Sequence, residues 1–465
     1  MKKLFSNAPQ STTIALVLKD NGCLETRRTP GLPLPVWPDG SWCTEVACYL
    51  GRLAAGNISF NDCGGTLATY ISQLSPLIRY CWRKDMLFSR MDDNSFTEFI
   101  SEVTAEKAYI KGVTYARRNS RTVCQIGRRC LDFLMHVGAL HNISNFVAVD
   151  GHISINIRNT SYRTKSGKTQ SVTYMSHRSF PPMGPVTTRH MVGQHYIEQL
   201  RDAAVSLTSN SFLHRRRLVL LRLLEMSGAR RLEISKISVA DILAAARLPN
   251  AELAIFNAKR RGGASPTTRM VDIGHQELTF ILDYIKYYRS VVIGKTIGSD
   301  NDHGSLLVSY TTGKPLTAGT LTLELSIMRR FAGISGKAHP HLFRHRFITM
   351  SLLALIKAHG IRNRAEFDSM LKIESFKEIV AQKSGHTNID SLDPYIDAAF
   401  IELNGAPMDA SALVKAFKIA ASIKSSLAEV SKLAENLDKD ELVSEFKMRF
   451  EGIQKDLAGL QSLKE

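Results

Sequence analysis

The chain has few cysteines, no long apolar run and too few acidic residues to balance its basic ones. Its seven cysteines all lie in the first third and form no Cys-x-x-Cys pair, so we expect reduced thiols in a cytoplasmic protein, not a disulfide framework or a zinc site. No run of about 18 uncharged apolar residues occurs, and no apolar segment follows the N-terminal lysines. The sequence therefore predicts neither a membrane span nor a signal peptide.

The excess of basic residues is large. Lys and Arg number 60 against 43 Asp and Glu, which gives a net charge of +17. A surplus of this size most often marks a polyanion partner, and nucleic acid is the first candidate. A basic protein without such a partner is the alternative. The composition, with 44% hydrophobic and 22% charged residues, is otherwise that of a globular protein, and 465 residues suffice for two or three domains.

The pattern of apolar residues divides the chain into five segments. They are a β-hairpin with a proline-rich connector (1–38), a helical segment (39–138), a β-rich insert or linker (139–188), a larger mixed segment (189–400) and an amphipathic helical tail (401–465). In the insert, one hairpin is expected around Asp150-Gly151 and a second around Ser166–Lys168. The predicted fold class is mainly α with small β-sheets, that is, α+β.

A dense basic face is predicted on a helix that begins near Ser120. In isolation, such a face is as often a solvated surface as a binding site. Five arginines without interleaved acidic residues favour contact with phosphates. We expect these arginines, and two more at the turn of a later hairpin, to bind DNA. They are Arg117, Arg118, Arg121, Arg128 and Arg129, followed by Arg260 and Arg261.

The tail differs in charge from the rest of the chain. It carries nine basic and eleven acidic residues, so the polyanion is not expected to bind there. Apolar residues recur every three or four positions, and Asp438 with Glu441 predicts the start of a second helix. We expect the tail to contact a neighbouring protomer, and the alternative is that it packs on its own domain.

Two polar clusters, His341–Phe347 and Ser384–Tyr395, stand out in the last third of the chain. The first precedes an apolar helical run, so His341 and Arg344 are expected near the start of a helix, on one face. Histidines, an arginine and a tyrosine beside apolar residues can hold a phosphate and attack it. These clusters predict a phosphoryl-transfer site.

The motifs together resemble the active site of the tyrosine recombinases, the phage integrase family. Gly228-Ala-Arg230 with Glu233 resembles its first arginine motif, and Lys259 falls at the strand-turn position of its lysine. The segments around Arg344 and Tyr395 resemble its His-x-x-Arg-His and Gly-His…Tyr boxes. One such box is weak, but six positions in this order and spacing are a strong signal. They are Arg230, Lys259, His341, Arg344, His386 and Tyr395, with Glu233 supporting.

The resemblance implies a role for each of these residues. Tyr395 would attack the scissile phosphate and form a 3′-phosphotyrosyl link. Arg230 and Arg344 would bind its non-bridging oxygens, because two guanidinium forks match a phosphate. His386 would donate to the developing charge, and His341 would accept or orient the proton of the tyrosine. Lys259 would protonate the leaving 5′-oxygen as a general acid.

The resemblance also implies how such an enzyme works and with what. It implies no metal and no ATP, and the sequence contains no Gly-x-x-x-x-Gly-Lys-Ser/Thr loop. A helical core-binding domain at 39–138 and a catalytic domain at 189–400 would form a clamp around double-stranded DNA. Four protomers would act on two recombination sites of a mobile element, for its integration, excision or transposition. Accessory DNA-bending proteins or a partner recombinase are further expected partners, in the cytoplasm at the nucleoid.

Two other functions remain open from the sequence. A type IB topoisomerase uses similar residues but acts as a monomer that relaxes supercoils. A DNA-binding accessory protein could keep the pattern without catalysis. Each single residue also has an ordinary structural explanation, such as an ion pair at a helix end for Arg230 and Glu233 or a half-buried phenol for Tyr395. The complete set of six argues against loss of catalysis.

Overall fold

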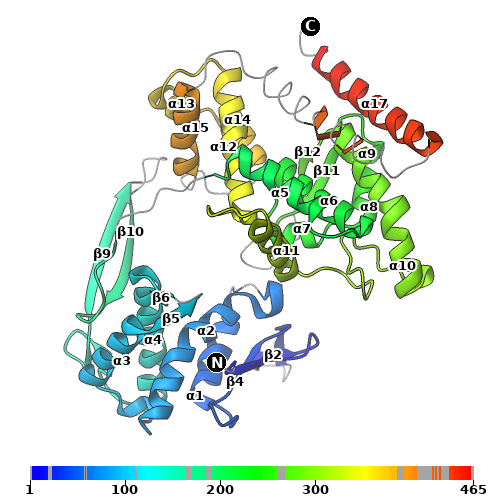
Figure 1. The fold of residues 1–465 in the computed structure, drawn as a ribbon. Helices are drawn as coiled ribbons and strands as arrows, with labels where there is room; N and C mark the ends of the chain where they lie inside the picture. Colours follow the sequence, from blue (N-terminus) through cyan, green and yellow to red (C-terminus); the bar gives the residue numbers. More distant parts are fainter. Residues whose placement is uncertain are drawn as a thin grey trace. The chain divides into compact units, whose positions relative to one another are not determined.

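The structure is a computed structural model that describes residues 3–18, 24–56, 58, 60–110, 113–163, 169–184, 191–258, 268–384, 392–405, 422–423, 425–426, 429–430 and 439–461. These residues are mainly helical, and each sheet that they form has two strands (Figure 1). The predicted fold class, mainly α with small sheets, is confirmed. No helix among these residues is long and apolar enough to cross a membrane.

The chain divides into two compact units between residues 187 and 188, apart from residues 259–264, which lie outside the described residues. Their elements follow in chain order. The first unit contains β1 (Phe5–Asn7), β2 (Thr13–Leu18), β3 (Leu24–Arg28), β4 (Pro33–Pro35), α1 (Thr44–Ala54), α2 (Asn61–Arg83), η1 (Phe88–Arg90), α3 (Asp93–Ala105), β5 (Lys107–Ile110), β6 (Val113–Ala116), α4 (Ser120–Leu140), β7 (Val147–Ala148), β8 (Ile153–Ser154), β9 (Asn156–Arg163) and β10 (Thr169–Ser176).

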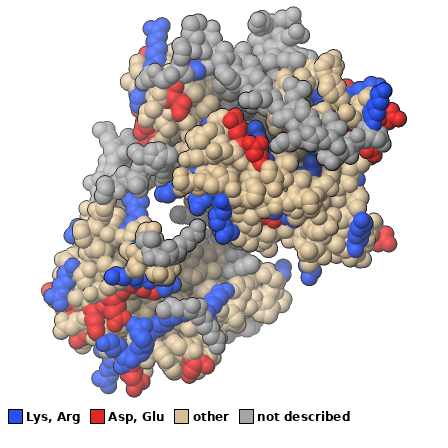
Figure 2. All heavy atoms as spheres, viewed as in Figure 1, with Lys and Arg blue, Asp and Glu red and all other residues tan. Residues whose placement is uncertain are grey.

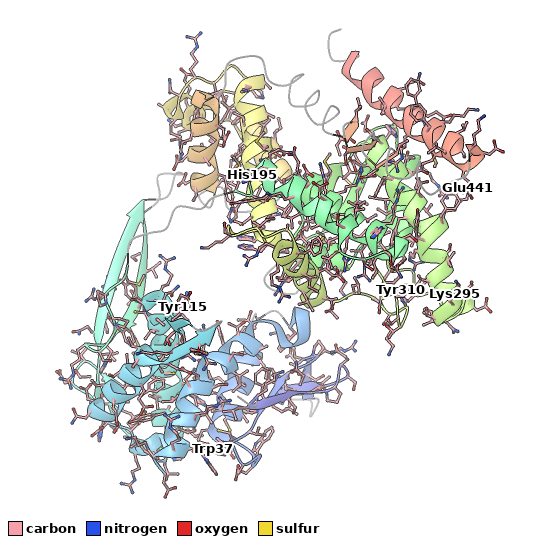
Figure 3. All side chains as sticks on the ribbon, in the orientation of Figure 1. Trp37, Tyr115, His195, Lys295, Tyr310 and Glu441 are labelled. Carbon is pink, nitrogen blue, oxygen red and sulfur yellow. The ribbon has the colours of Figure 1, made fainter. Side chains whose placement is uncertain are left out.

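Aromatic side chains fill the core of the first unit, between its four helices. Phe133 meets Phe88 edge to face at 5.0 Å between ring centroids, and Trp37, labelled in Figure 3, stacks on Phe88 at 5.0 Å. Two of the four helices begin where a short polar side chain accepts a backbone N–H. Asp92 caps α3 and Asn119 caps α4 in this way. The helical periodicity of this segment therefore gives a packed domain.

Two details of this unit differ from the sequence-based expectation. The hairpin predicted around Asp150-Gly151 is wrong, because β7 and β8 have two residues each and pair in parallel. Gly151 permits the chain to fold back tightly, since a Cβ there would lie 2.2 Å from the carbonyl oxygen of Asn145. The β5–β6 hairpin was not predicted at all. The hairpins β2–β3 and β9–β10 are present as expected.

The second unit is larger. It contains α5 (Gln194–Ser206), α6 (Ser211–Ser227), α7 (Arg231–Ser235), α8 (Val239–Arg247), β11 (Glu252–Phe256), β12 (Thr268–Asp272), α9 (His275–Asp283), η2 (Tyr284–Arg289), α10 (Ser290–Thr296), η3 (Ser299–Asn301), α11 (Ala318–Phe331), α12 (Pro340–Ala358), α13 (Arg364–Met370), α14 (Glu374–Ser384), α15 (Asp393–Gly405) and α17 (Lys439–Gln461).

Helix α6 lies at the centre of the second unit. Helices α5, α9 and α12 and the π-helical turn η2 all pack against it. It is buried on every side, and its buried residues include four arginines as well as the apolar run from Leu218 to Leu224. Buried arginines require carboxylate partners. Arg216 and Arg217 share Glu324 of α11, for example, at 2.5 and 2.9 Å.

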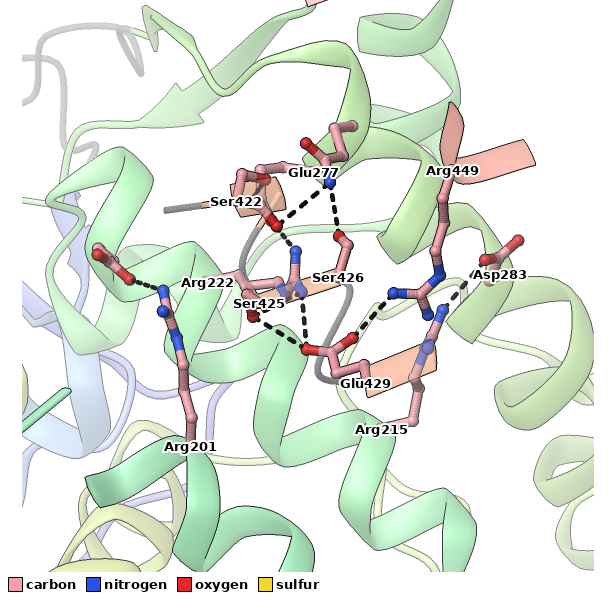
Figure 4. A network of polar contacts seen from close by, with 12 residues as sticks. Arg201, Arg215, Arg222, Glu277, Asp283, Ser422, Ser425, Ser426, Glu429 and Arg449 are labelled. Atoms are coloured by element: carbon pink, nitrogen blue, oxygen red, sulfur yellow. Dashed lines mark hydrogen bonds and ion pairs between the residues drawn. The ribbon is translucent and has the colours of Figure 1, made fainter. Parts of the chain in front are cut away.

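The tail supplies partners for the other two arginines of α6 (Figure 4). Arg222 lies between Glu277 of α9, at 2.6 Å, and Glu429 of the tail, at 2.8 Å. Arg449 of α17 binds the same Glu429 at 3.1 Å. Arg215 is 3.7 Å from Glu445 of α17 and 3.0 Å from Asp283. The tail thus completes a buried ion network in its own chain.

These contacts bear on the expectation for the tail. Helix α17 packs on α9, and Gln276 of α9 donates to the hydroxyl of Ser426 at 2.5 Å. The described part of the tail therefore packs back on its own domain, which was the alternative in the sequence analysis. Contact of the tail with a neighbouring protomer stays a prediction. The first of the two expected tail helices falls largely outside the described residues.

The ion network predicts acid-sensitive stability. Burial by itself would raise the pKa of Glu429, but Arg222 and Arg449 lower it from 4.5 to about 2. Since the folded-state pKa is the lower one, this stabilisation is present above pH 4.5 and is lost as the pH falls towards 2. We expect Glu429→Gln to lower the free energy of unfolding at neutral pH by about 3 kcal/mol and to weaken its dependence on acid.

Urea unfolding followed by far-UV circular dichroism checks this expectation, with Glu451→Gln as the control because Glu451 is exposed on the same α17. All three tryptophans, Trp37, Trp42 and Trp82, lie in the first unit, so tryptophan fluorescence reports on that unit. The urea midpoint of the fluorescence transition should therefore be the same in Glu429→Gln as in the wild type. If Glu429→Gln also left the urea midpoint of the circular dichroism transition unchanged, the network would not be stabilising.

Candidate active site

The site is built around the sharp turn between α6 and α7. Gly228 ends α6 in the left-handed conformation, with φ of +56°, and Arg230 is the N-cap of α7. The hydroxyl of Ser227 accepts a hydrogen bond from the backbone N–H of Ala229 at 3.1 Å. Glycine suits this position for two reasons: the positive φ, and a Cβ that would lie 2.3 Å from the ring of Phe347.

The carboxylate of Glu233 holds the arginine of this turn. Its side chain is fully buried and accepts from Arg230 twice, from Nη1 at 2.6 Å and from the backbone N–H at 2.9 Å. It also accepts from the backbone N–H of Ala258 at 3.2 Å and from Nη2 of Arg269 at 3.3 Å. Burial would raise the pKa of Glu233, but the Arg230 backbone hydrogen bond and both guanidinium charges lower it.

Helix α12 brings the second predicted arginine to the same turn. Pro340 is the first residue of α12, so His341 and Arg344 lie in its first turns, as predicted. Nη1 of Arg344 donates to the carbonyl oxygen of Gly228 at 2.8 Å. Burial, together with the charges of Arg230 and Arg269, lowers the pKa of Arg344 to about 10. Three guanidinium groups thus surround one carboxylate, which makes the site receptive to an anion.

The tyrosine reaches this helix from α15, which packs along α12. The rings of His341 and His345 lie 4.3 Å apart, and His345 stacks on Tyr395 at 5.0 Å. Tyr395 is only 4% exposed and belongs to the core formed with α12 and α14. A negative charge on its oxygen would favour the charged form of Arg344. The phenol is therefore coupled electrostatically to Arg344 and through ring contacts to the two histidines.

The structure brings together four of the six predicted catalytic residues. They are Arg230, His341, Arg344 and Tyr395, with Glu233 behind Arg230. Lys259 and His386 lie outside the described residues, as do Arg260 and Arg261. Within the described ranges, no group of three or more His, Cys, Asp or Glu residues could hold a metal ion.

One buried residue of the site was not selected from the sequence. Arg269 lies on β12 and donates to the carbonyl oxygen of Ser227 at 3.2 Å as well as to Glu233. Its burial alternates with that of its neighbours, so it faces inward with Val271. The alternating pattern of this strand could have identified it as an arginine at a core position.

The predicted basic face of the first unit is only partly free for a ligand. Arg117 and Arg118 form ion pairs with Glu106. Arg128 donates to the carbonyl oxygen of Met175 at 3.3 Å, and Arg129 binds Asp132 at 2.8 Å. Arg121 is exposed. Figure 2 accordingly shows basic and acidic side chains interspersed on this unit.

A hollow of about 480 Å³ lies beside this face. Basic side chains outnumber acidic ones in its lining. The charged residues that line it are Lys3, Arg79, Arg83, Glu102, Glu106, Arg117 and Arg118. The charged side chains that line the hollow therefore have a net positive charge, even though Arg117 and Arg118 form ion pairs with Glu106.

Comparison with known proteins gives structural similarity only. No family model matches the chain, and no curated protein does. Among solved structures, it is similar to the XerH site-specific recombinase in a post-cleavage complex on a palindromic difH substrate, with 15% identity, coverage of 82% of this chain and 85% of that one, and a TM-score of 0.42.

Two further structures are similar at the same level. A lambda integrase tetramer bound to a Holliday junction shares 13% identity over 79% of this chain and 78% of that one, with a TM-score of 0.40. XerA recombinase shares 14% identity over 78% of this chain and 98% of that one, with a TM-score of 0.32. With identities and TM-scores this low, the residues of the site carry the functional argument.

The α6–α7 turn predicts a specific glycine effect. We expect Gly228→Ala to destabilise the second unit by about 2–4 kcal/mol, because it adds a clash with Phe347 to the cost of a positive φ. Gly333→Ala is the matched control, since Gly333 has a φ of +66° with nothing within 4 Å of a Cβ. Urea unfolding of both variants measures the difference, and equal losses would show that the contact with Phe347 contributes nothing.

Proposed function

We propose that the chain is a site-specific tyrosine recombinase or integrase that cuts and rejoins DNA through a 3′-phosphotyrosyl intermediate. The observation that carries the proposal is the meeting of Arg230, Arg344 and Tyr395 around one anion-receptive turn. Guanidinium forks bind a phosphate bidentately and keep their charge. A phenol beside them is the nucleophile that such a phosphate would meet.

In this proposal Tyr395 attacks phosphorus, and the 5′-oxygen of the broken bond leaves. Arg230 and Arg344 stabilise the negative charge on the non-bridging oxygens, a contribution of about 10²–10³ in rate for each donor. His341 accepts or orients the phenolic proton, and His345 meets His341 edge to face and stacks on Tyr395. Lys259 is proposed to protonate the leaving oxygen, and His386 to donate to the phosphate.

The burial of Tyr395 is compatible with this chemistry. A phenol has a pKa of about 10 and needs its proton removed as it attacks. A site that excludes water strengthens the interactions between the arginines and the developing charge. With a phosphate bound, the surplus positive charge around Glu233 would be neutralised. The chemistry therefore needs no divalent ion for charge compensation, and rejoining conserves the phosphodiester energy without ATP.

The proposed enzyme would assemble on DNA. Double-stranded DNA would lie against both units, with Arg121 and the hollow lined by Arg79 and Arg83 meeting its phosphates. Four protomers on two recombination sites would exchange strands of a mobile element.

The decisive test is a covalent adduct. The protein is incubated in EDTA with nicked duplexes drawn from the DNA that flanks its gene, and we expect an SDS-resistant protein–DNA adduct. Tyr395→Phe should abolish it, whereas Tyr284→Phe, which removes the hydroxyl of another buried tyrosine of the same unit, should not. An adduct that survives Tyr395→Phe would identify a different nucleophile. No adduct on any flank would favour a non-catalytic DNA-binding protein.

Phosphate binding by the first unit has its own test. If DNA binding uses six to ten phosphate contacts, affinity should fall by about 10³–10⁵ between 50 and 200 mM salt. Arg121→Gln should reduce the slope of log K against log salt by about 1. Arg90→Gln, at another exposed arginine of the same unit, serves for comparison in the same gel-shift titration. An Arg121 variant with an unchanged slope would remove this residue from the DNA contact.

A further inference from the structure

Arg269 is placed where it can control the geometry of Arg230. Its Nη1 donates to the carbonyl oxygen of Ser227, at the end of α6, and its Nη2 donates to Glu233, in α7. The two acceptors lie on opposite sides of the Gly228 turn. One planar guanidinium therefore joins the last residue of α6 to a side chain of α7.

The burial of Arg269 makes this contact costly. Its side chain is 5% exposed, and burial lowers its pKa even though Glu233 favours the charged form. An apolar side chain beside Val271 would avoid this cost, and buried ion pairs of this kind add little to stability by themselves. The charge at this position is therefore better explained by the geometry that it imposes on its neighbours.

Glu233 transmits this geometry to Arg230. Its Oε2 accepts from both Arg269 and the backbone N–H of Arg230, and its Oε1 accepts from Nη1 of Arg230. A carboxylate with several donors of fixed direction cannot rotate freely. The guanidinium of Arg230 is thus oriented by a carboxylate that Arg269 orients in turn.

We propose that Arg269 is a positioning residue that sets the orientation of Arg230 through Glu233 and the Ser227 carbonyl. The inference rests on the proposed function, because it concerns the rate at which Tyr395 attacks a phosphate held by Arg230. Arg269 itself does not touch the DNA. Its loss should slow strand cleavage while leaving DNA affinity nearly unchanged.

Single-turnover cleavage rates on the substrate that traps the adduct test this proposal. Arg269→Met should lower the rate by about 10–100-fold, since a displacement of about 1 Å can cost 10². The dissociation constant for DNA should stay within about 3-fold. The cleavage rate of Arg269→Lys should fall nearly as far, because an ammonium group keeps the positive charge but lacks the planar guanidinium fork that joins two acceptors.

A double-mutant cycle separates positioning from a general loss of structure. Arg230→Ala should lower the rate by about 10²–10³. If Arg269 acts through Arg230, the double variant should be no slower than Arg230→Ala, within about 3-fold. The proposal would be overturned if the cleavage rate of the double variant fell by the product of the two single-variant reductions. It would also be overturned if Arg269→Met cleaved at the wild-type rate.

Arg289 provides a matched control for loss of a buried arginine. It is 3% exposed, donates to the carbonyl oxygen of Ser305 at 2.7 Å and binds Asp302 with both Nη atoms, at 2.7 and 2.5 Å. Arg289→Met should reduce thermal stability to an extent similar to Arg269→Met but keep the cleavage rate within about 3-fold. An equal drop in rate for both variants would assign the effect of Arg269 to stability alone. No cleavage by the wild-type protein would overturn the proposed function itself.

Discussion

The buried carboxylate of Glu233 is the group on which the arrangement of the site depends. It accepts hydrogen bonds from the turn after α6, from the end of β11 and from β12, so it joins three segments that are separate in the sequence. A buried carboxylate is tolerated only when donors replace its lost hydration. The donors here are two arginines and two backbone amides, and one of these arginines is the proposed phosphate ligand.

The site keeps a positive surplus that this carboxylate does not cancel. Arg344 is 2% exposed and its pKa is lowered to about 10, because burial disfavours its charge and Arg230 and Arg269 repel it. Charges held together in this way raise the energy of the free protein. An anion that entered would relieve the repulsion, so part of the binding energy for a phosphate is already stored in the fold.

Sequence reasoning found those parts of the structure that have a local signal. The spacing of Arg230 and Glu233, and of His341 and Arg344, follows from helix geometry, and the structure places all four as the spacing predicts. Residues without a local signal were missed. The role of Arg269 depends on acceptors about forty positions away, and the parallel pairing of β7 with β8 depends on a fold-back at Gly151 that resembles a hairpin turn in sequence. The sequence predicts an exposed basic face for the stretch that contains Arg128 and Arg129, yet both side chains make contacts within the unit.

The ion network of the tail has a consequence for how the protein is made. Arg222 and Glu429 are 207 residues apart, so the central helix of the second unit is synthesised long before its partner. At a translation rate of about 5–20 residues per second, Arg222 waits roughly 10–40 s on the ribosome for this carboxylate. The helix that ends at the Arg230 turn therefore reaches its final packing late in synthesis. A nascent chain that stops before Glu429 would leave Arg222 with Glu277 alone and the ion network incomplete, so such a chain is a natural substrate for chaperones and proteases.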